Sequence, residues 1–242
     1  MFGFFGKKKH RLIDSGLLHG MTDIHSHILP GVDDGSPDTA TSLQLLAFME
    51  ELGFRHVWLT PHVMEDFPNC NDRLQAIFSQ LCADYKGPIR LSLASEYMLD
   101  AGFPARIPHK VLPLGKNHLL VETSYMYGPS GLYSILLDVY NHGYRPVIAH
   151  PERYMYMDAD DYELLKSKGY QFQLNLLSLS GYYGSRPREV SEKLLSQGCY
   201  DYVGSDLHHL HRYQPMLQSL KLTQEQLDQL EQLLHNNTEF SQ

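Results

Sequence analysis

Short apolar runs alternate along the chain with longer segments in which apolar residues recur at helical spacing. The runs are β-branched or aliphatic and are bounded by Gly, Pro or polar residues, which is typical of strands. We expect strands at residues 22–26, 56–60, 90–96, 118–122, 145–149, 170–176 and 201–205.

Segments with helical spacing follow most of these runs. In the first of them, Leu43, Leu46 and Ala47 form one apolar stripe, and Gly53 ends the pattern. The stretch 97–117 is rich in Pro and Gly and is the chief irregular insertion. We expect helices at residues 37–53, 71–86, 130–142, 159–168, 187–197 and 224–235.

The order of these elements predicts an α/β fold. Seven strands joined by helices through short connections indicate one parallel sheet, which we expect to close into a barrel. A chain of 242 residues is long enough for one such domain. No repeat or linker divides the sequence, so we expect a single domain at 21–242, preceded by an N-terminal tail at 1–20.

Composition excludes several classes of function. The formal net charge of −8 argues against general nucleic-acid binding, which needs a basic surface. No run approaches the roughly 18 apolar residues that a membrane span needs. The three cysteines, Cys70, Cys82 and Cys199, form no CxxC pair and no disulfide framework, which suits a reducing cytoplasm.

The first eleven residues place an apolar run before a basic cluster and are too short for a signal peptide. Two interpretations stay open. The segment is a flexible tail, or its aromatic and basic residues make weak contact with a membrane surface or a partner protein.

Metal-ligand residue types stand at the far ends of the predicted strands. In a barrel of parallel strands these ends converge on one face. His25 and His27 lie two apart on a strand and therefore share a face, and Asp206 and His208 repeat this spacing. The candidate ligands are His25, His27, Asp34, His62, Glu96, Glu122, His150, Asp206 and His208.

Each of these signals is weak when taken alone. Asp33 and Asp34 precede Gly35, where Asp also favours a tight turn, and a lone His62 would more often be a structural loop residue. Glu96 and Glu122 end apolar runs, where a carboxylate is costly unless a cation or a salt bridge compensates it. Together the residues predict a multinuclear centre of zinc, manganese or iron, and hence a metal-dependent hydrolase.

Charge counting indicates the kind of substrate. Five neutral imidazoles and four carboxylates bring a charge of −4, against about +6 from three divalent ions. The remaining two or so positive charges favour a phosphate group over a neutral amide or ester. A cysteine-dependent phosphatase is excluded, because that route needs an arginine six residues after the cysteine. Those positions hold Ala76, Pro88 and Ser205.

The combined motifs resemble the polymerase and histidinol phosphatase (PHP) superfamily. The run from Asp23 to Ser36, with the later Ala-His-Pro-Glu-Arg, is similar to its bacterial protein-tyrosine phosphatases of capsular and exopolysaccharide synthesis. The resemblance covers about residues 21–212. It rests on the HxH at 25–27, Leu-Pro-Gly-Val-Asp-Asp-Gly at 29–35, Thr-Pro-His at 60–62, Ala-His-Pro-Glu-Arg at 149–153 and Ser-Asp-Leu-His at 205–208.

The resemblance implies a distorted, TIM-like (β/α)7 barrel with three metal ions, usually manganese or iron. By motif matching, one ion would be held by His25, His27, Glu96 and Asp206. A second would share Glu96 and be held also by Glu122 and His150. The third would be held by Asp34, His62 and His208.

The resemblance also implies hydrolysis of phosphotyrosine by a metal-activated water, with Arg153 and Arg212 gripping the phosphate. The implied substrate is a tyrosine kinase that regulates polysaccharide synthesis. Two alternatives remain: a small-molecule phosphatase, such as one acting on histidinol phosphate, and a non-catalytic interaction module. After Glu122 the chain reads Thr-Ser-Tyr-Met-Tyr where relatives often have Phe-Pro, so Tyr125 and Tyr127 either line the mouth of the site or only pack.

Overall fold

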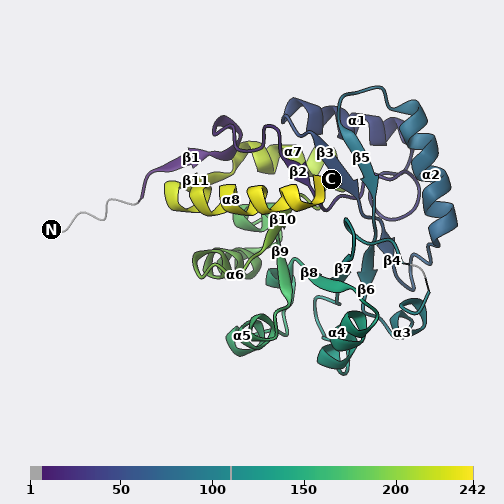
Figure 1. Cartoon of the computed structure of the whole chain (residues 1–242). Helices are drawn as coiled ribbons and strands as arrows, with labels where there is room; N and C mark the ends of the chain where they lie inside the picture. The colour runs from purple at the N-terminus through teal and green to yellow at the C-terminus, as the bar shows by residue number, and fades with distance from the viewer. Residues whose placement is uncertain (1–6, 110, 242) are drawn as a thin grey trace.

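The computed structural model describes residues 7–109 and 111–241, and the strands of its two parallel sheets lie between the helices, with β1 (Lys9–Arg11) and β11 (Lys221–Thr223) at the edge of the molecule (Figure 1). Two parallel sheets form the framework, in the orders β10-β9-β8-β7-β6-β4 and β2-β3-β5. Strands of the larger sheet are β4 (His62–Val63), β6 (Glu96–Met98), β7 (His118–Glu122), β8 (Arg145–Ala149), β9 (Gln171–Asn175) and β10 (Tyr202–Gly204). Strands of the smaller sheet are β2 (Thr22–Asp23), β3 (His56–Leu59) and β5 (Arg90–Leu93).

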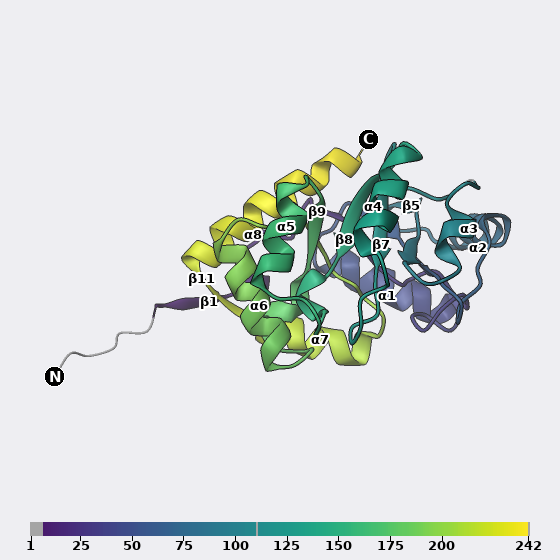
Figure 2. The same ribbon diagram turned by 90° about the horizontal axis from the view of Figure 1, so that it is seen from below.

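Each predicted helix is present, with bounds shifted by a few residues, and two further helices lie where none was expected (Figure 2). The helices are α1 (Thr39–Glu51), α2 (Asn71–Asp84), α3 (Phe103–Arg106), α4 (Leu132–Asn141), α5 (Ala159–Ser167), α6 (Ser185–Ser196), α7 (Leu210–Ser219) and α8 (Gln224–Asn236). The unexpected helices are α3 and α7. Pro215 inside α7 and the short length of α3 obscure the helical pattern in the sequence. None of the described helices combines the length and apolar character that a membrane crossing requires.

The expected single sheet is divided in two. The ladder of β3 stops at Thr60-Pro61, because proline has no backbone N–H to donate. Beyond Pro61 the same two segments pair again as β4 and β6, beginning where the N–H of Glu96 donates to the carbonyl of Pro61 at 3.1 Å. On the opposite side, a single parallel bridge joins Ser26 to Leu207. The fold is therefore α/β with parallel sheets, and continuous pairing of the described residues does not close seven strands into a ring.

A small apolar core lies inside the curved sheets, separate from the larger core beneath the helices. The small core consists of Ile24, Trp58, Ala94, Leu114, Leu120, Val147, Ala149, Tyr202 and Phe240. Phe240 comes from the C-terminal 3-10 helix η4 (Asn237–Ser241), and Trp58 donates its indole N–H to the Phe240 carbonyl at 3.0 Å. The carbonyl of Thr22, at the start of β2, accepts from Asn237 at 2.9 Å. The C-terminal segment thus covers the end of the sheets where strands begin, and the opposite end is left for the polar residues.

Residues 9–20 pack on the domain instead of forming a free tail. Strand β1 (Lys9–Arg11) pairs antiparallel with β11 (Lys221–Thr223). Leu12, in the 3-10 helix η1 (Leu12–Asp14), and Leu18 are buried. The sequence hides this pairing because its partner lies at the other end of the chain. The aromatic part of the expected tail, residues 1–6, lies outside the described residues.

Candidate metal centre

The structure brings together all nine residues that the sequence nominated as ligands. They form four overlapping groups, and within each group the ligand atoms lie within 4.8 Å of one another. The groups are His27-Asp34-His62-His208, His25-His27-Asp206, His25-Glu96-His150 and His62-Glu96-Glu122. Parallel strand ends explain this meeting of residues that are distant in sequence.

Glu96 lies at the middle of the cluster and is fully buried. Its Oε2 atom is 3.2 Å from His25 Nε2, 3.3 Å from His27 Nε2 and 3.1 Å from His62 Nδ1. Its other oxygen, Oε1, lies 3.0 Å from His150 Nε2. One carboxylate thus faces four imidazoles, which is the arrangement expected of a ligand shared between neighbouring ions.

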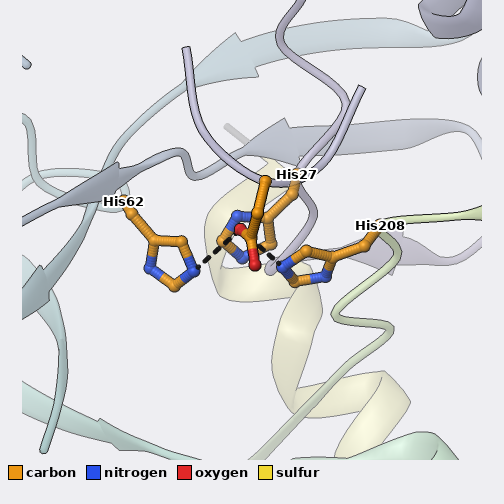
Figure 3. A group of neighbouring side chains, drawn as sticks. His27, His62 and His208 are labelled. Atoms are coloured by element: carbon orange, nitrogen blue, oxygen red, sulfur yellow. Dashed lines mark ion pairs between the residues drawn. The ribbon is translucent and has the colours of Figure 1, made fainter. Parts of the chain in front are cut away.

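A second focus lies at the mouth, where the rings of His27, His62 and His208 turn toward one another from three separate segments (Figure 3). The Oδ1 atom of Asp34 is 3.5 Å from Nε2 of both His62 and His208. The rings of His27 and His208 stack at 3.8 Å. The Asp34 side chain is 60% exposed, so this group faces solvent while Glu96 does not.

His62 occupies a position between two groups. Its Nδ1 lies 2.9 Å from Glu122 Oε1, and its Nε2 faces Asp34. Motif matching placed His62 only with Asp34 and His208, so its closeness to Glu122 is a difference from that assignment. His150 Nε2 lies 3.9 Å from Glu122 Oε2, which keeps Glu122 beside the group that was expected for it.

Two residues that sequence reasoning did not nominate orient the imidazoles. Asp33 Oδ2 accepts from His27 Nδ1 at 2.9 Å and from the His62 N–H at 3.1 Å. Gln173 Oε1 accepts from His25 Nδ1 at 2.8 Å. These two contacts leave Nε2 of each ring as the nitrogen through which a metal ion would be bound. Gln173 could have been suspected from the sequence, because it is a polar residue inside the expected strand at 170–176.

Asp206 is held from its outer side. Its Oδ2 atom accepts from Arg153 at 2.9 Å, from Asn175 at 2.6 Å and from the Tyr183 hydroxyl at 3.2 Å. Its Oδ1 atom is left facing the imidazoles, 3.4 Å from His25 Nε2. Asp206 has φ +53° and His150 has φ +34°, values that non-glycine residues seldom adopt. Such local strain at two strand ends is typical of functional sites.

The charges of the cluster depend on one another. Burial by itself would raise the pKa of Glu96, but His25 and His62 hold it well below its usual range. Burial would likewise lower the pKa of His25, whereas Glu96 and Asp206 together raise it to about 9. The Glu96 carboxylate is therefore ionised and can neutralise a cation.

The donor set fits divalent metal ions. Four buried atoms of the cluster residues, His62 Nδ1, Glu96 Oε2, Glu122 Oε1 and His150 Nδ1, make no well-formed hydrogen bond within the described part of the chain. Buried polar atoms are normally satisfied, so these four point to missing partners. Imidazole nitrogens with carboxylate oxygens are the ligands that zinc, manganese and iron accept.

Both candidate phosphate-binding arginines line one pocket beside the cluster, with a volume of about 260 Å³. Arg153 lies between two aromatic rings, 4.2 Å from the centroid of Tyr125 and 4.1 Å from that of Tyr183. Asp34, His150 and Asp206 line the pocket, as do Arg212, His62, Tyr182, His208, His209 and Tyr213. An anion in this pocket would meet both guanidinium groups and the proposed ligands.

Comparison with known proteins agrees with this geometry. The tyrosine-protein phosphatase YwqE of Bacillus subtilis is 28% identical over 211 residues, which cover 78% of each chain. The tyrosine-protein phosphatase CpsB of Streptococcus pneumoniae is 28% identical over 228 residues, which cover 82% of this chain and 87% of the relative.

Solved structures share the fold. A crystal structure from work on YwqE and CpsB, described as unique metal-dependent tyrosine phosphatases, matches with a TM-score of 0.69 at 25% identity over 89% of this chain and 95% of that one. A phosphotriesterase homology protein of Escherichia coli shares the fold alone, with a TM-score of 0.55 at 14% identity over 92% and 99% of the two chains. Residues 21–240 match the family described as capsular polysaccharide synthesis, CpsB/CapC, and the chain belongs to that family.

Proposed function

We propose that this protein is a metal-dependent protein-tyrosine phosphatase. The observation that carries the proposal is the nine-residue cluster of imidazoles and carboxylates beside a pocket lined by two arginines. The relatives named tyrosine-protein phosphatases support the same reaction. The reaction is hydrolysis of a phosphotyrosine ester on a protein, and the proposed substrate is a tyrosine kinase that regulates polysaccharide synthesis.

Three ions are proposed, with manganese first and iron or zinc as alternatives. The first would be held by His25, His27, Glu96 and Asp206. By motif matching, the second would be held by Glu96, Glu122 and His150, with His150 Nε2 3.9 Å from Glu122 Oε2. The third would be held by Asp34, His62 and His208, which lie in one group with His27. When bound, such ions supply Lewis-acid activation of a water nucleophile and neutralise charge on the phosphoryl group.

The residues of the chain bind and orient the phosphate. Arg153 is the principal clamp, because the two rings that enclose it hold its planar fork in one orientation. Arg212 completes the clamp from the start of α7. Phenolate is a better leaving group than an alkoxide, so a dedicated general acid matters less here than for an alkyl ester, and no residue is assigned to that role.

The same proposal includes a distorted (β/α)7 barrel over residues 21–242, closed by the contact between Ser26 and Leu207. It also places the protein in the cytoplasm, where its three free cysteines would stay reduced. These two points are supported by the parallel strand pairing and by cysteine usage.

The test compares three substrates on protein purified without chelator. Metal content is measured, and turnover is then followed with a phosphotyrosine peptide, with histidinol phosphate and with a simple alkyl phosphate. The proposal expects the phosphotyrosine peptide to be hydrolysed at least about tenfold faster than either alkyl ester. Faster turnover of histidinol phosphate would favour a small-molecule phosphatase. Bound metal without any ester hydrolysis would favour a non-catalytic module.

A further inference from the structure

An exposed apolar surface borders the pocket. Four side chains form it: Tyr125, Met126 and Tyr127 after β7, and Met155 after β8. Their exposed fractions are 37%, 57%, 77% and 45% in that order. The N–H of Met155 donates to the carbonyl of Tyr125 at 2.7 Å, so the two loops lie side by side. We call these four residues the apolar rim.

The apolar rim is continuous with the pocket. Tyr125 covers the Arg153 guanidinium, and its ring lies 5.9 Å from that of His150. Tyr125 lines the pocket, whereas the neighbouring Met126 and Tyr127 do not. A ligand that fills the pocket therefore contacts Tyr125, and the other three rim residues lie in the same two loops.

The size of the pocket limits how much of a protein substrate can enter it. A volume of about 260 Å³ falls below the roughly 300–1,000 Å³ usual for drug-sized ligands, so the pocket accepts one side chain with its phosphate. The remainder of a protein substrate has to lie outside. Its residues next to the phosphotyrosine then meet the surface at the mouth.

The side chains of the rim are suited to contact with an apolar residue of the substrate. The loop at 123–131 contains no charged side chain, and neither does the stretch 154–157. Methionine adapts its shape to varied apolar partners, and exposed aromatic rings offer a flat apolar surface. The lining of the pocket itself includes charged and polar side chains, among them Asp34, His209 and Arg212. The apolar rim and the pocket therefore differ in chemistry.

We propose that the apolar rim binds an apolar or aromatic side chain next to the phosphotyrosine of the protein substrate. This inference rests on the proposed phosphatase function and makes it more specific. The enzyme would read sequence on one side of the phosphorylated residue, through the loops that follow β7 and β8. Tyr127, the most exposed of the four, would make the outermost contact.

The test uses two phosphotyrosine peptides that differ only in the residues flanking the phosphotyrosine, leucine in one and serine in the other. For the metal-loaded enzyme we expect kcat/KM to be about tenfold higher for the leucine peptide, the lower end of the discrimination that one apolar group provides. In the double variant Met126→Ser/Tyr127→Ser this ratio should fall toward one. Leu137→Ser removes a 55% exposed leucine from α4 and should keep the ratio near ten.

Binding of the same two peptides with an unreactive phosphonate in place of phosphotyrosine separates this inference from the proposed function. A preference in Kd that the double variant loses would support the rim even if turnover were absent. Equal affinity and equal kcat/KM for both peptides would overturn the rim while leaving the phosphatase in place. A dimer that dissociates in the double variant would assign the rim to a second copy of the chain and would also overturn the inference.

Discussion

Arg153 donates from its guanidinium to Oδ2 of Asp206 at 2.9 Å, while the other oxygen of that carboxylate faces the imidazole cluster. The candidate phosphate clamp is thus joined to a candidate metal ligand. Asn175 and the Tyr183 hydroxyl bind the same oxygen, so Asp206 keeps two partners if Arg153 is removed. The contributions of the arginine and the carboxylate can therefore be separated by mutation.

Arg153→Ala should retain the metal and lower kcat/KM for a phosphotyrosine peptide by about 100-fold, comparable to the loss of one positioned donor to a developing charge. Metal analysis and steady-state kinetics on the same preparation check this. Arg188→Ala is the matched control, because that arginine forms its ion pair with Glu192 on the surface of α6. Loss of metal from Arg153→Ala would mean that the arginine acts mainly by holding Asp206.

The neighbouring carboxylates Asp33 and Asp34 should behave differently. Asp34→Asn removes a proposed ligand at the mouth and should leave the protein about one ion short. Asp33→Asn removes the charge beside His27 Nδ1 and the His62 N–H but no proposed ligand, so the ions should stay at saturating metal while affinity drops about 10- to 100-fold. Calorimetric titration of the metal-free variants with manganese measures both the number of ions bound and their affinity. Equal stoichiometry in the two variants would contradict the assignment of Asp34 as a ligand.

Phe240→Ala should destabilise the fold by about 3–5 kcal/mol, because it empties a fully buried position in the small core. Urea unfolding measures the change, and Leu137→Ala at an exposed site is the control. Metal content per folded molecule should not change, since η4 covers the end of the sheets opposite the cluster. A loss below about 1 kcal/mol would show that the C-terminal segment is not part of the core.

His56 gives the stability of the protein a dependence on pH. Burial, together with Arg90, lowers the pKa of His56 to about 4 from 6.5. Between these values the unfolded chain binds a proton that the folded chain does not, so stability should fall as the pH drops from 6.5 to 4. His56→Gln removes this titrating group. Between pH 6.5 and 4 the free energy of unfolding of the variant should therefore fall less than that of the wild-type protein, and the difference should be on the order of 1 kcal/mol. Identical pH slopes for the two proteins would contradict the lowered pKa.

The meeting of the nine cluster residues could be predicted from sequence because one rule places them. A strand ends where its apolar run ends, and parallel strands end on one face, so Glu96, Glu122 and His150 were expected to meet without knowledge of the pairing. The orienting residues Asp33 and Gln173 could not be identified in this way, because their role depends on the direction in which His27 and His25 turn.

Features that depend on pairing between distant segments could also not be predicted from the sequence. Each run gave its own strand, but the interruption at Pro61 and the single bridge at Ser26 depend on the register between neighbours. The packing of β1 on β11 joins the two ends of the chain, so no local pattern indicates it.

The most direct test of the metal centre is a crystal structure of the protein grown with manganese, with anomalous scattering measured at the metal edge. We predict separate manganese peaks within the cluster, with Glu96 contacting two of them and Asp34, His62 and His208 around another. Ordered side chains that point apart around a site without anomalous signal would contradict the central claim.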